Sequence, residues 1–203
     1  VIVGAVAAVF ALTSTTANAQ FTERKIRVSF GVSAENPVSI GVKKMQEIVE
    51  QKSGGKMKIV PYYNGALGPD MQAVQALRGG TQEMVIPSSS PLIGLIKDIG
   101  IFDMPFLFKD RDHAYRALDT VGMELGKPLE GKGIKLLGYM ENGIRHMTDN
   151  VRPIKTPADM KGLKIRVMNN KVYVEMVKSL GASPTPMALA ELYSAMQAGV
   201  VDG

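Results

Sequence analysis

The sequence predicts an α/β protein built on mainly parallel sheets. Segments with the two-residue period of a strand alternate with segments that carry apolar residues at helical spacing. Glycine, proline and asparagine separate most of these segments, as they do at turns. Strands that alternate with helices favour parallel sheets, because a crossover between parallel strands usually runs through a helix.

The first residues are typical of a secretory signal. Residues 1–12 are almost wholly apolar and uncharged, and the small residues Ala17-Asn18-Ala19 follow shortly after. We interpret residues 1–19 as a signal remnant with cleavage after Ala19, since the apolar run is too short to span a bilayer. No basic segment precedes this run, so we expect the printed sequence to begin inside the signal. A buried N-terminal helix is the alternative.

Composition excludes several classes of protein. The chain has 203 residues, a net charge of +5 and no cysteine, which rules out thiol catalysis and cysteine metal sites. The only compact basic patch is 24–27, and tryptophan is absent. A nucleic-acid binder usually concentrates charge and adds stacking aromatic residues, so we expect no nucleic-acid partner. After Gln20 no segment is apolar enough to cross a membrane.

The elements follow one another in a regular order. Asn36-Pro37 predicts a capped helix start, and Ser53-Gly54-Gly55 its end. Alternation and helical spacing predict strands at 25–32, 57–62, 83–87, 134–139, 144–148 and 163–168. They predict helices at 37–52, 71–78, 112–126, 171–180 and 187–198, and a capped helical turn at 156–159.

Two domains are expected. Gly138 and Asn142-Gly143 punctuate consecutive predicted strands, so we place the change of domain near 139–143. This assigns 20–140 to a first lobe and 141–203 to a second, incomplete one. The last residues, Val200-Val201-Asp202-Gly203, are typical of a strand that enters a turn. We therefore expect the protein to continue beyond the printed sequence.

Catalytic patterns are missing. His113 and His146 are far apart, and no zinc, phosphate-loop or nucleophile-elbow motif occurs. Ser88-Ser89-Ser90 has no evident base beside it. We therefore predict no catalytic residue, no metal and no cofactor, and keep an enzyme acting on a carboxylate substrate as the alternative.

Arginine residues on two predicted strands are the best candidates for a binding site. Alternation directs Leu163, Ile165 and Val167 to one face and Arg166 to the other, where a covered sheet would partly bury it. A buried guanidinium needs an anion, and its planar fork matches a carboxylate. Arg145, on the preceding predicted strand, would add a second cation. For Arg166 an internal salt bridge or an exposed strand end remains open, and for Arg145 a plain surface position.

Two helix starts offer further anion-binding groups. Ser88 opens a serine run before Pro91, and Ser33 precedes Asn36-Pro37. Free backbone N–H groups and hydroxyls at such starts can bind anions, but ordinary capping is the preferred explanation for each.

Several segments, in this order and spacing, resemble the DctP-type solute-binding proteins of TRAP transporters, the tripartite ATP-independent periplasmic systems. The resemblance covers about 25–203. The segments that carry it are Gly65-Ala66-Leu67-Gly68, 102–108, 158–167, Pro184-Thr185-Pro186-Met187 and 191–203.

The resemblance implies two α/β lobes that close on a ligand about a hinge. Arg166 matches the arginine that pairs with the ligand carboxylate, Arg145 a second arginine, and Asn169 an asparagine that lines the site. In the sialic-acid branch an aromatic residue stands at Leu189 and a glutamate near Ser88, so the departures here imply a smaller acid. The implied partners are an organic anion and the membrane subunits of a TRAP transporter, with the protein itself in the periplasm. A solute-binding protein of an ATP-driven importer is a further alternative.

Overall fold

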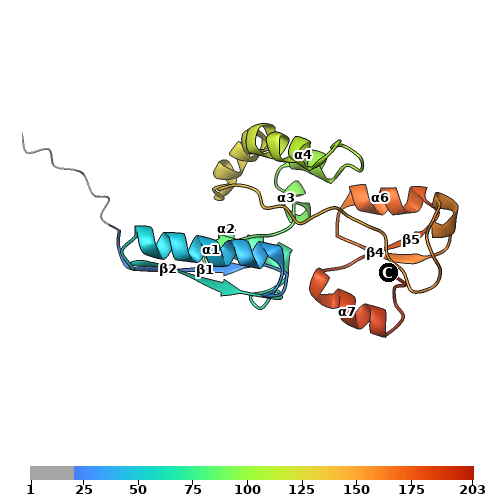
Figure 1. The fold of residues 1–203 in the computed structure, drawn as a ribbon, viewed down its shortest axis with the longest axis horizontal. Coiled ribbons are helices and arrows are strands. Elements are labelled where there is room, and N and C mark those ends of the chain that lie inside the picture. Colours follow the sequence, from blue (N-terminus) through green and yellow to red (C-terminus); the bar gives the residue numbers. More distant parts are fainter. Residues whose placement is uncertain (1–20) are drawn as a thin grey trace, which may run out of the picture.

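Two separate parallel sheets organise the molecule. The computed structural model describes residues 21–203, so the predicted signal and its cleavage after Ala19 lie outside the described residues. One sheet has the strand order β2-β1-β3, and the other pairs β4 with β5. Figure 1 shows the first sheet in the blue and teal half of the chain and the second in the orange half, each with a helix alongside. The predicted α/β class with parallel sheets is confirmed.

Strand β1 (Arg24–Ser29) is the centre of the first sheet, between β2 (Met57–Tyr62) and β3 (Met84–Val85). Its carboxyl end is covered on both faces, and Val28, Ser29 and Phe30 are all at most 2% exposed. Helices α1 (Pro37–Lys52) and α2 (Asp70–Arg78) provide the crossovers. The predicted cap of α1 is confirmed, since the Asn36 side chain accepts a hydrogen bond from the N–H of Val38 at 2.9 Å.

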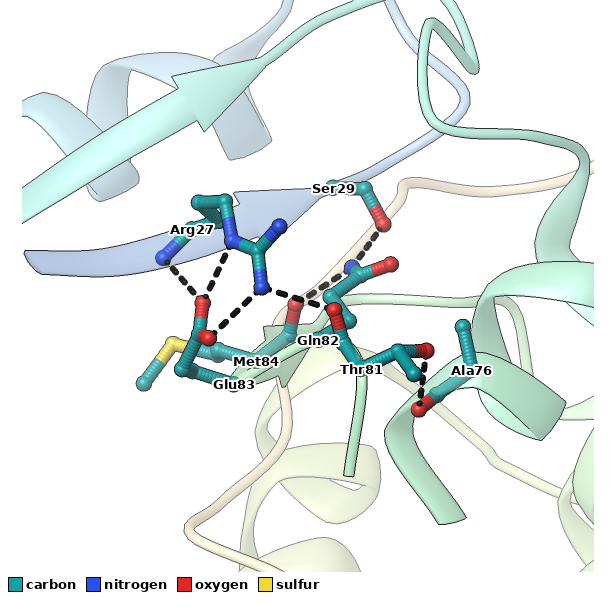
Figure 2. Close-up of polar contacts among 7 residues, drawn as sticks. All are labelled: Arg27, Ser29, Ala76, Thr81, Gln82, Glu83 and Met84. Carbon is teal, nitrogen blue, oxygen red and sulfur yellow. Dashed lines mark hydrogen bonds and ion pairs between the residues drawn. The ribbon is translucent and has the colours of Figure 1, made fainter. Parts of the chain in front are cut away.

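Side chains join β1 to the segment that leads into the short strand β3 (Figure 2). The Arg27 guanidinium donates to Glu83 from Nε to Oε2 at 2.9 Å and from Nη2 to Oε1 at 2.7 Å. The backbone N–H of Arg27 donates to the same Oε2 at 3.0 Å. Next to this pair, the buried Gln82 amide donates to the hydroxyl of Ser29 and to the carbonyl of Met84. Strand β3 pairs with β1 through only two residues, and these side-chain contacts add to that pairing.

The region between the sheets is helical. It contains α3 (Ser90–Ile93), the 3₁₀ turn η1 (Lys97–Asp103), α4 (Arg111–Ala117), the π turn η2 (Leu118–Gly122), α5 (Met123–Gly126) and the 3₁₀ turn η3 (Lys127–Lys132). The helix predicted at 112–126 is therefore present, as the consecutive elements α4, η2 and α5. Tyr115 and Val121 are exposed, whereas Gly122 and Gly126 are buried. A Cβ on Gly126 would lie 2.2 Å from Leu136 Cδ2, so the glycine side is what permits close packing.

The strands predicted at 134–139 and 144–148 are wrong. Both segments lack regular secondary structure, and Leu137 and Ile144 are 68% and 71% exposed. An extended segment becomes a strand only when its N–H and C=O groups pair with a neighbouring strand. Within the described part of the chain, no strand pairs with either segment.

The second sheet holds β4 (Lys164–Val167) against β5 (Ser183–Pro186), with α6 (Lys171–Ser179) packed on it, the 3₁₀ turn η4 (Pro157–Met160) before it and α7 (Leu189–Gln197) after it. The predicted burial of Ile165 and Val167 is confirmed. Strand β5 was not predicted, because two prolines argue against a strand. They are tolerated here because Ser183 and Met187 donate to β4, which leaves Pro184 and Pro186 facing the other edge.

The closing residues 201–203 lie along the opposite side of β4. Asp202 donates its N–H to the carbonyl of Lys164 at 2.7 Å, and its Oδ2 accepts from the Lys164 N–H at 2.7 Å. The carbonyl of Gly203 accepts from the N–H of Arg166 at 2.7 Å. A Cβ on Gly203 would fall 1.7 Å from the carbonyl oxygen of Thr148, so only glycine fits there. The Val-Asp-Gly motif thus positions the strand that carries Arg166.

Replacing Glu83 with glutamine should lower the free energy of unfolding at pH 7 by about 1 kcal/mol, because a partly exposed ion pair and its hydrogen bonds are lost. Hydrogen bonds from the side chain and backbone of Arg27 lower the pKa of Glu83 from 4.5 to about 2. Since the folded value lies below the unfolded one, the stabilisation is complete above pH 4.5 and disappears as the pH falls toward 2.

Urea denaturation at pH 7 and pH 3 should therefore show a wild-type advantage that shrinks on acidification. Glu47→Gln is the control, since Glu47 pairs with Lys44 on an exposed helix surface. An advantage independent of pH would contradict the assignment.

Candidate ligand-binding site

The guanidinium of Arg166 is anchored on one side only. It lies on β4 and is half-buried, on the face opposite Ile165 and Val167. Nε and Nη2 donate to the carbonyl oxygen of Met187 at 3.2 and 3.0 Å. Arginine has five N–H donors, so this acceptor uses a minority of them. The structure shows no other hydrogen bond from this guanidinium to the described residues.

Arg166 has no carboxylate in ion-pair contact among residues 21–203. Burial lowers the pKa of its guanidinium, the positive charge of Arg145 lowers it further, and the carboxylate of Asp70 opposes both. Burial is the largest of these causes, so the shift reports a guanidinium that is partly removed from water.

Arg145 lies close enough to Arg166 for the two charges to repel, and it rests on an aromatic ring. Its Cζ atom is 4.6 Å from the centroid of Tyr173, a cation–π contact. This contact holds an otherwise exposed side chain of the irregular 133–156 segment against α6. The structure therefore brings the two predicted arginines together, although the strand predicted for Arg145 does not form.

A buried carboxylate stands behind this ring. Asp103, at the end of η1, is 6% exposed and accepts hydrogen bonds from the hydroxyls of Ser89 and Tyr173 and from the amide of Asn170. Burial, followed by the charge of Asp103, raises the pKa of Tyr173 to about 12. The phenol therefore remains protonated and donates to Asp103 at 3.1 Å across neutral pH. This network joins α6 to the helical region beside the first sheet.

Ser88 is held by a carboxylate from another element. Both its N–H and its hydroxyl donate to Asp70 Oδ2, at 2.9 and 3.1 Å. Ser88 follows β3, and Asp70 begins α2, so both lie at the carboxyl-end edge of the first sheet, where ligands of α/β proteins gather. The charge of Asp70 also acts on Arg166. Ser88 is thus on the same side as the arginine pair.

Leu189, the first residue of α7, approaches the same edge of the first sheet. Its Cδ2 lies 3.9 Å from the position that a Cβ on Gly31 would occupy, just after β1. Asp70 Oδ1 lies 3.6 Å from that position. Leu189 remains 45% exposed, so it offers an apolar wall beside the polar groups.

Two predicted residues are not gathered into this group by any contact. Ser33 is exposed, and its carbonyl accepts from the hydroxyl of Ser39 at 2.6 Å as part of the turn into α1. Asn169 is exposed beyond the end of β4, and its neighbour Asn170 is the one that reaches Asp103. Their roles as ligand contacts stay predictions.

Three residues of this region were missed by the sequence reading: Asp70, Asp103 and Tyr173. Asp103 did give a signal, since it is a lone acid inside the apolar run 101–108. Such a residue is buried only with hydrogen-bond partners, which the sequence could not supply.

The described residues contain no group of three or more histidine and acidic side chains that could hold a metal ion. None of their helices is long and apolar enough to cross a membrane. Two hollows among them have volumes of about 370 and 560 Å³, and neither includes Arg145 or Arg166. The first is lined by Arg24, Ile26, Met57, Leu77, Gly80, Gln82, Glu83 and Met84, and the second by residues 147–154.

The comparisons with known proteins decide the family. Residues 28–203 match the DctP family model, described as bacterial extracellular solute-binding protein, family 7. The chain belongs to this family. It is 37% identical over 180 residues to the 2,3-diketo-L-gulonate-binding periplasmic protein of Escherichia coli, covering 88% of this chain and 55% of that protein. The DctP-family chain thus spans little more than half the length of this relative.

Solved structures of TRAP periplasmic solute-binding proteins superpose well on this chain. A TRAP periplasmic solute-binding protein of a Polaromonas species, bound to D-erythronate, superposes with a TM-score of 0.86 and 36% identity over 89% of this chain and 60% of that one. One from Sulfurospirillum deleyianum, bound to succinate, gives 0.85 and 35% over 90% and 59%. The two-lobe fold class expected from the resemblance is therefore supported for this DctP-family chain.

Asp103→Asn should lower the free energy of unfolding by about 1–3 kcal/mol, because the new amide NH₂ would face a hydroxyl or amide donor inside a buried network. The matched control is Asp98→Asn, an exposed acid in the same 3₁₀ turn. Chemical denaturation monitored by circular dichroism measures both. Equal stability of the two variants would show that the Asp103 network contributes little.

Proposed function

We propose that the complete protein captures a small organic acid with Arg166 and Arg145 and delivers it to the membrane subunits of a TRAP transporter. The site would accept the ligand carboxylate at the free side of the Arg166 fork. Asn169, Ser33, Ser88 and Leu189 would line the remainder. The boundary between lobes would fall near 139–143, and the lobes would close over the acid once it is bound.

The observation that carries this proposal is the state of Arg166. Its guanidinium is half-buried, one carbonyl anchors it, and no carboxylate of the described residues pairs with it. Partial removal of a charge from water costs free energy, which a stable fold usually recovers with an internal counter-ion. A site that omits the counter-ion is suited to a ligand that brings it.

The affinity such a site can reach follows from ordinary magnitudes. A charge-assisted hydrogen bond contributes about 1.5–3 kcal/mol, and micromolar binding needs about 8 kcal/mol. Two bonds to one carboxylate are insufficient, so the second arginine and contacts along the acid must contribute the remainder. Arg145, fixed on Tyr173, supplies a second cation without a large loss of side-chain entropy.

The relatives support the same function and compartment. The similar Escherichia coli protein is a periplasmic protein named for binding a sugar acid, and the superposed structures hold D-erythronate and succinate. Each of these ligands carries at least one carboxylate. We propose export to the periplasm for this chain, and capture of the ligand without chemical conversion.

Arg166→Ala in the complete protein should abolish measurable binding of organic acids while the thermal midpoint changes by only a few degrees. Arg166→Lys should also bind poorly, because an ammonium cannot replace a bidentate fork. Titration calorimetry with a panel of mono- and dicarboxylates measures both. Arg116→Ala, which removes an exposed arginine on α4, is the control. Unchanged affinity in Arg166→Ala would refute the proposed clamp.

A further inference from the structure

The guanidinium of Arg145 rests on the ring of Tyr173, with Cζ 4.6 Å from the ring centroid. Arg145 is exposed and forms no ion pair among residues 21–203. The backbone before it offers little support, because Ile144 is 71% exposed. Gly143 has a positive φ of 92° and open space where a Cβ would be. The ring is therefore the support that holds this side chain against α6.

Tyr173 is itself held rigidly. It is 8% exposed and belongs to the buried apolar cluster of the second sheet, together with Leu163, Ile165 and Val177. Its hydroxyl donates a hydrogen bond to Asp103 Oδ1 at 3.1 Å. Close packing around the ring and a buried hydrogen bond at its far end fix both its position and its plane.

The two arginines repel each other, so Arg145 needs such a support. The charge of Arg145 lowers the pKa of the Arg166 guanidinium, which is the effect of a like charge. The face of a phenol ring carries partial negative charge and attracts a guanidinium. The ring thus offsets part of the repulsion. Unlike a carboxylate, it adds no full negative charge that would compete with an anionic ligand.

We propose that Tyr173 is a positioning residue of the ligand site, whose ring face holds the Arg145 guanidinium near Arg166 before a ligand binds. This inference rests on the proposed function, because it concerns the second arginine of the clamp. Tyr173 acts through Arg145 and is assigned no ligand contact. A guanidinium that is already ordered loses less entropy when a carboxylate arrives, which is worth about two- to tenfold in affinity.

The first test compares variants of the complete protein by titration calorimetry. The probe is the tightest-binding acid of a panel that includes D-erythronate and succinate. Tyr173→Leu removes the ring and should weaken this acid by about tenfold, whereas Tyr173→Phe keeps the ring face and should stay within about threefold of wild type. The control is Tyr193→Leu, which removes a 72% exposed tyrosine from α7 and should leave the affinity unchanged.

A double-mutant cycle with Arg145→Ala separates positioning from a structural role. Arg145→Ala should weaken the acid by itself, and adding Tyr173→Leu should cause no further loss, because the ring then has no guanidinium to hold. A ring with a purely structural role would cause the same loss in both backgrounds. That result would overturn the proposal, as would wild-type affinity in Tyr173→Leu.

A second substitution covers the case in which Tyr173→Leu does not fold. Pentafluorophenylalanine in place of Tyr173 keeps an aromatic ring but reverses the charge of its face, so it should bind the acid more weakly than Tyr173→Phe does. Equal affinity of these two proteins contradicts the proposal.

Arg166→Ala reports on the clamp independently of Tyr173. If Arg166→Ala loses binding while Tyr173→Leu binds like wild type, the clamp stands and the role of Tyr173 is overturned. If wild type binds no carboxylate of the panel, the clamp and the role of Tyr173 fail together.

Discussion

The Arg166 guanidinium donates hydrogen bonds to one acceptor, the carbonyl oxygen of Met187. Among residues 21–203 it forms no ion pair with a carboxylate. Much of the surrounding structure serves to keep it in this state. The pairing of β4 with β5 positions Met187 as the anchor, and residues 202–203 hold the other side of the strand. The second arginine is fixed by an aromatic ring and not by an acid, so it adds positive charge without neutralising it.

The acids near the site make no ion pair with Arg145 or Arg166 among the described residues. Asp103 is buried and accepts hydrogen bonds from Ser89, Asn170 and Tyr173. Asp70 is engaged on one oxygen by Ser88. Two arginines and the carboxylate of Asp70 thus share one region of the molecule.

The Asp103 network also bears on conformational change. It connects η1 to the start of α6, and those elements belong to the two different lobes that the sequence analysis expects. A fully satisfied buried polar network is rigid and specific in geometry. The network also supports the Tyr173 ring on which Arg145 rests.

Local information was sufficient for elements whose hydrogen bonds are internal or whose pattern is strong. The helix at 37–52, with its Asn36 cap, and the alternating burial of β4 follow from spacing and capping alone. The pointing of Arg166 away from the core follows from the same alternation.

Tertiary structure decided what depends on partners remote in sequence. The segments 134–139 and 144–148 have strand-like patterns but no ladder neighbour in the described part, whereas the proline-containing 183–186 has one along β4. The tertiary structure also decided that Asp70 and Tyr173 lie near the arginines. Residues 70 and 166 are about 100 positions apart, so their proximity depends on how the two sheets pack. Local periodicity in the sequence carries no signal of it.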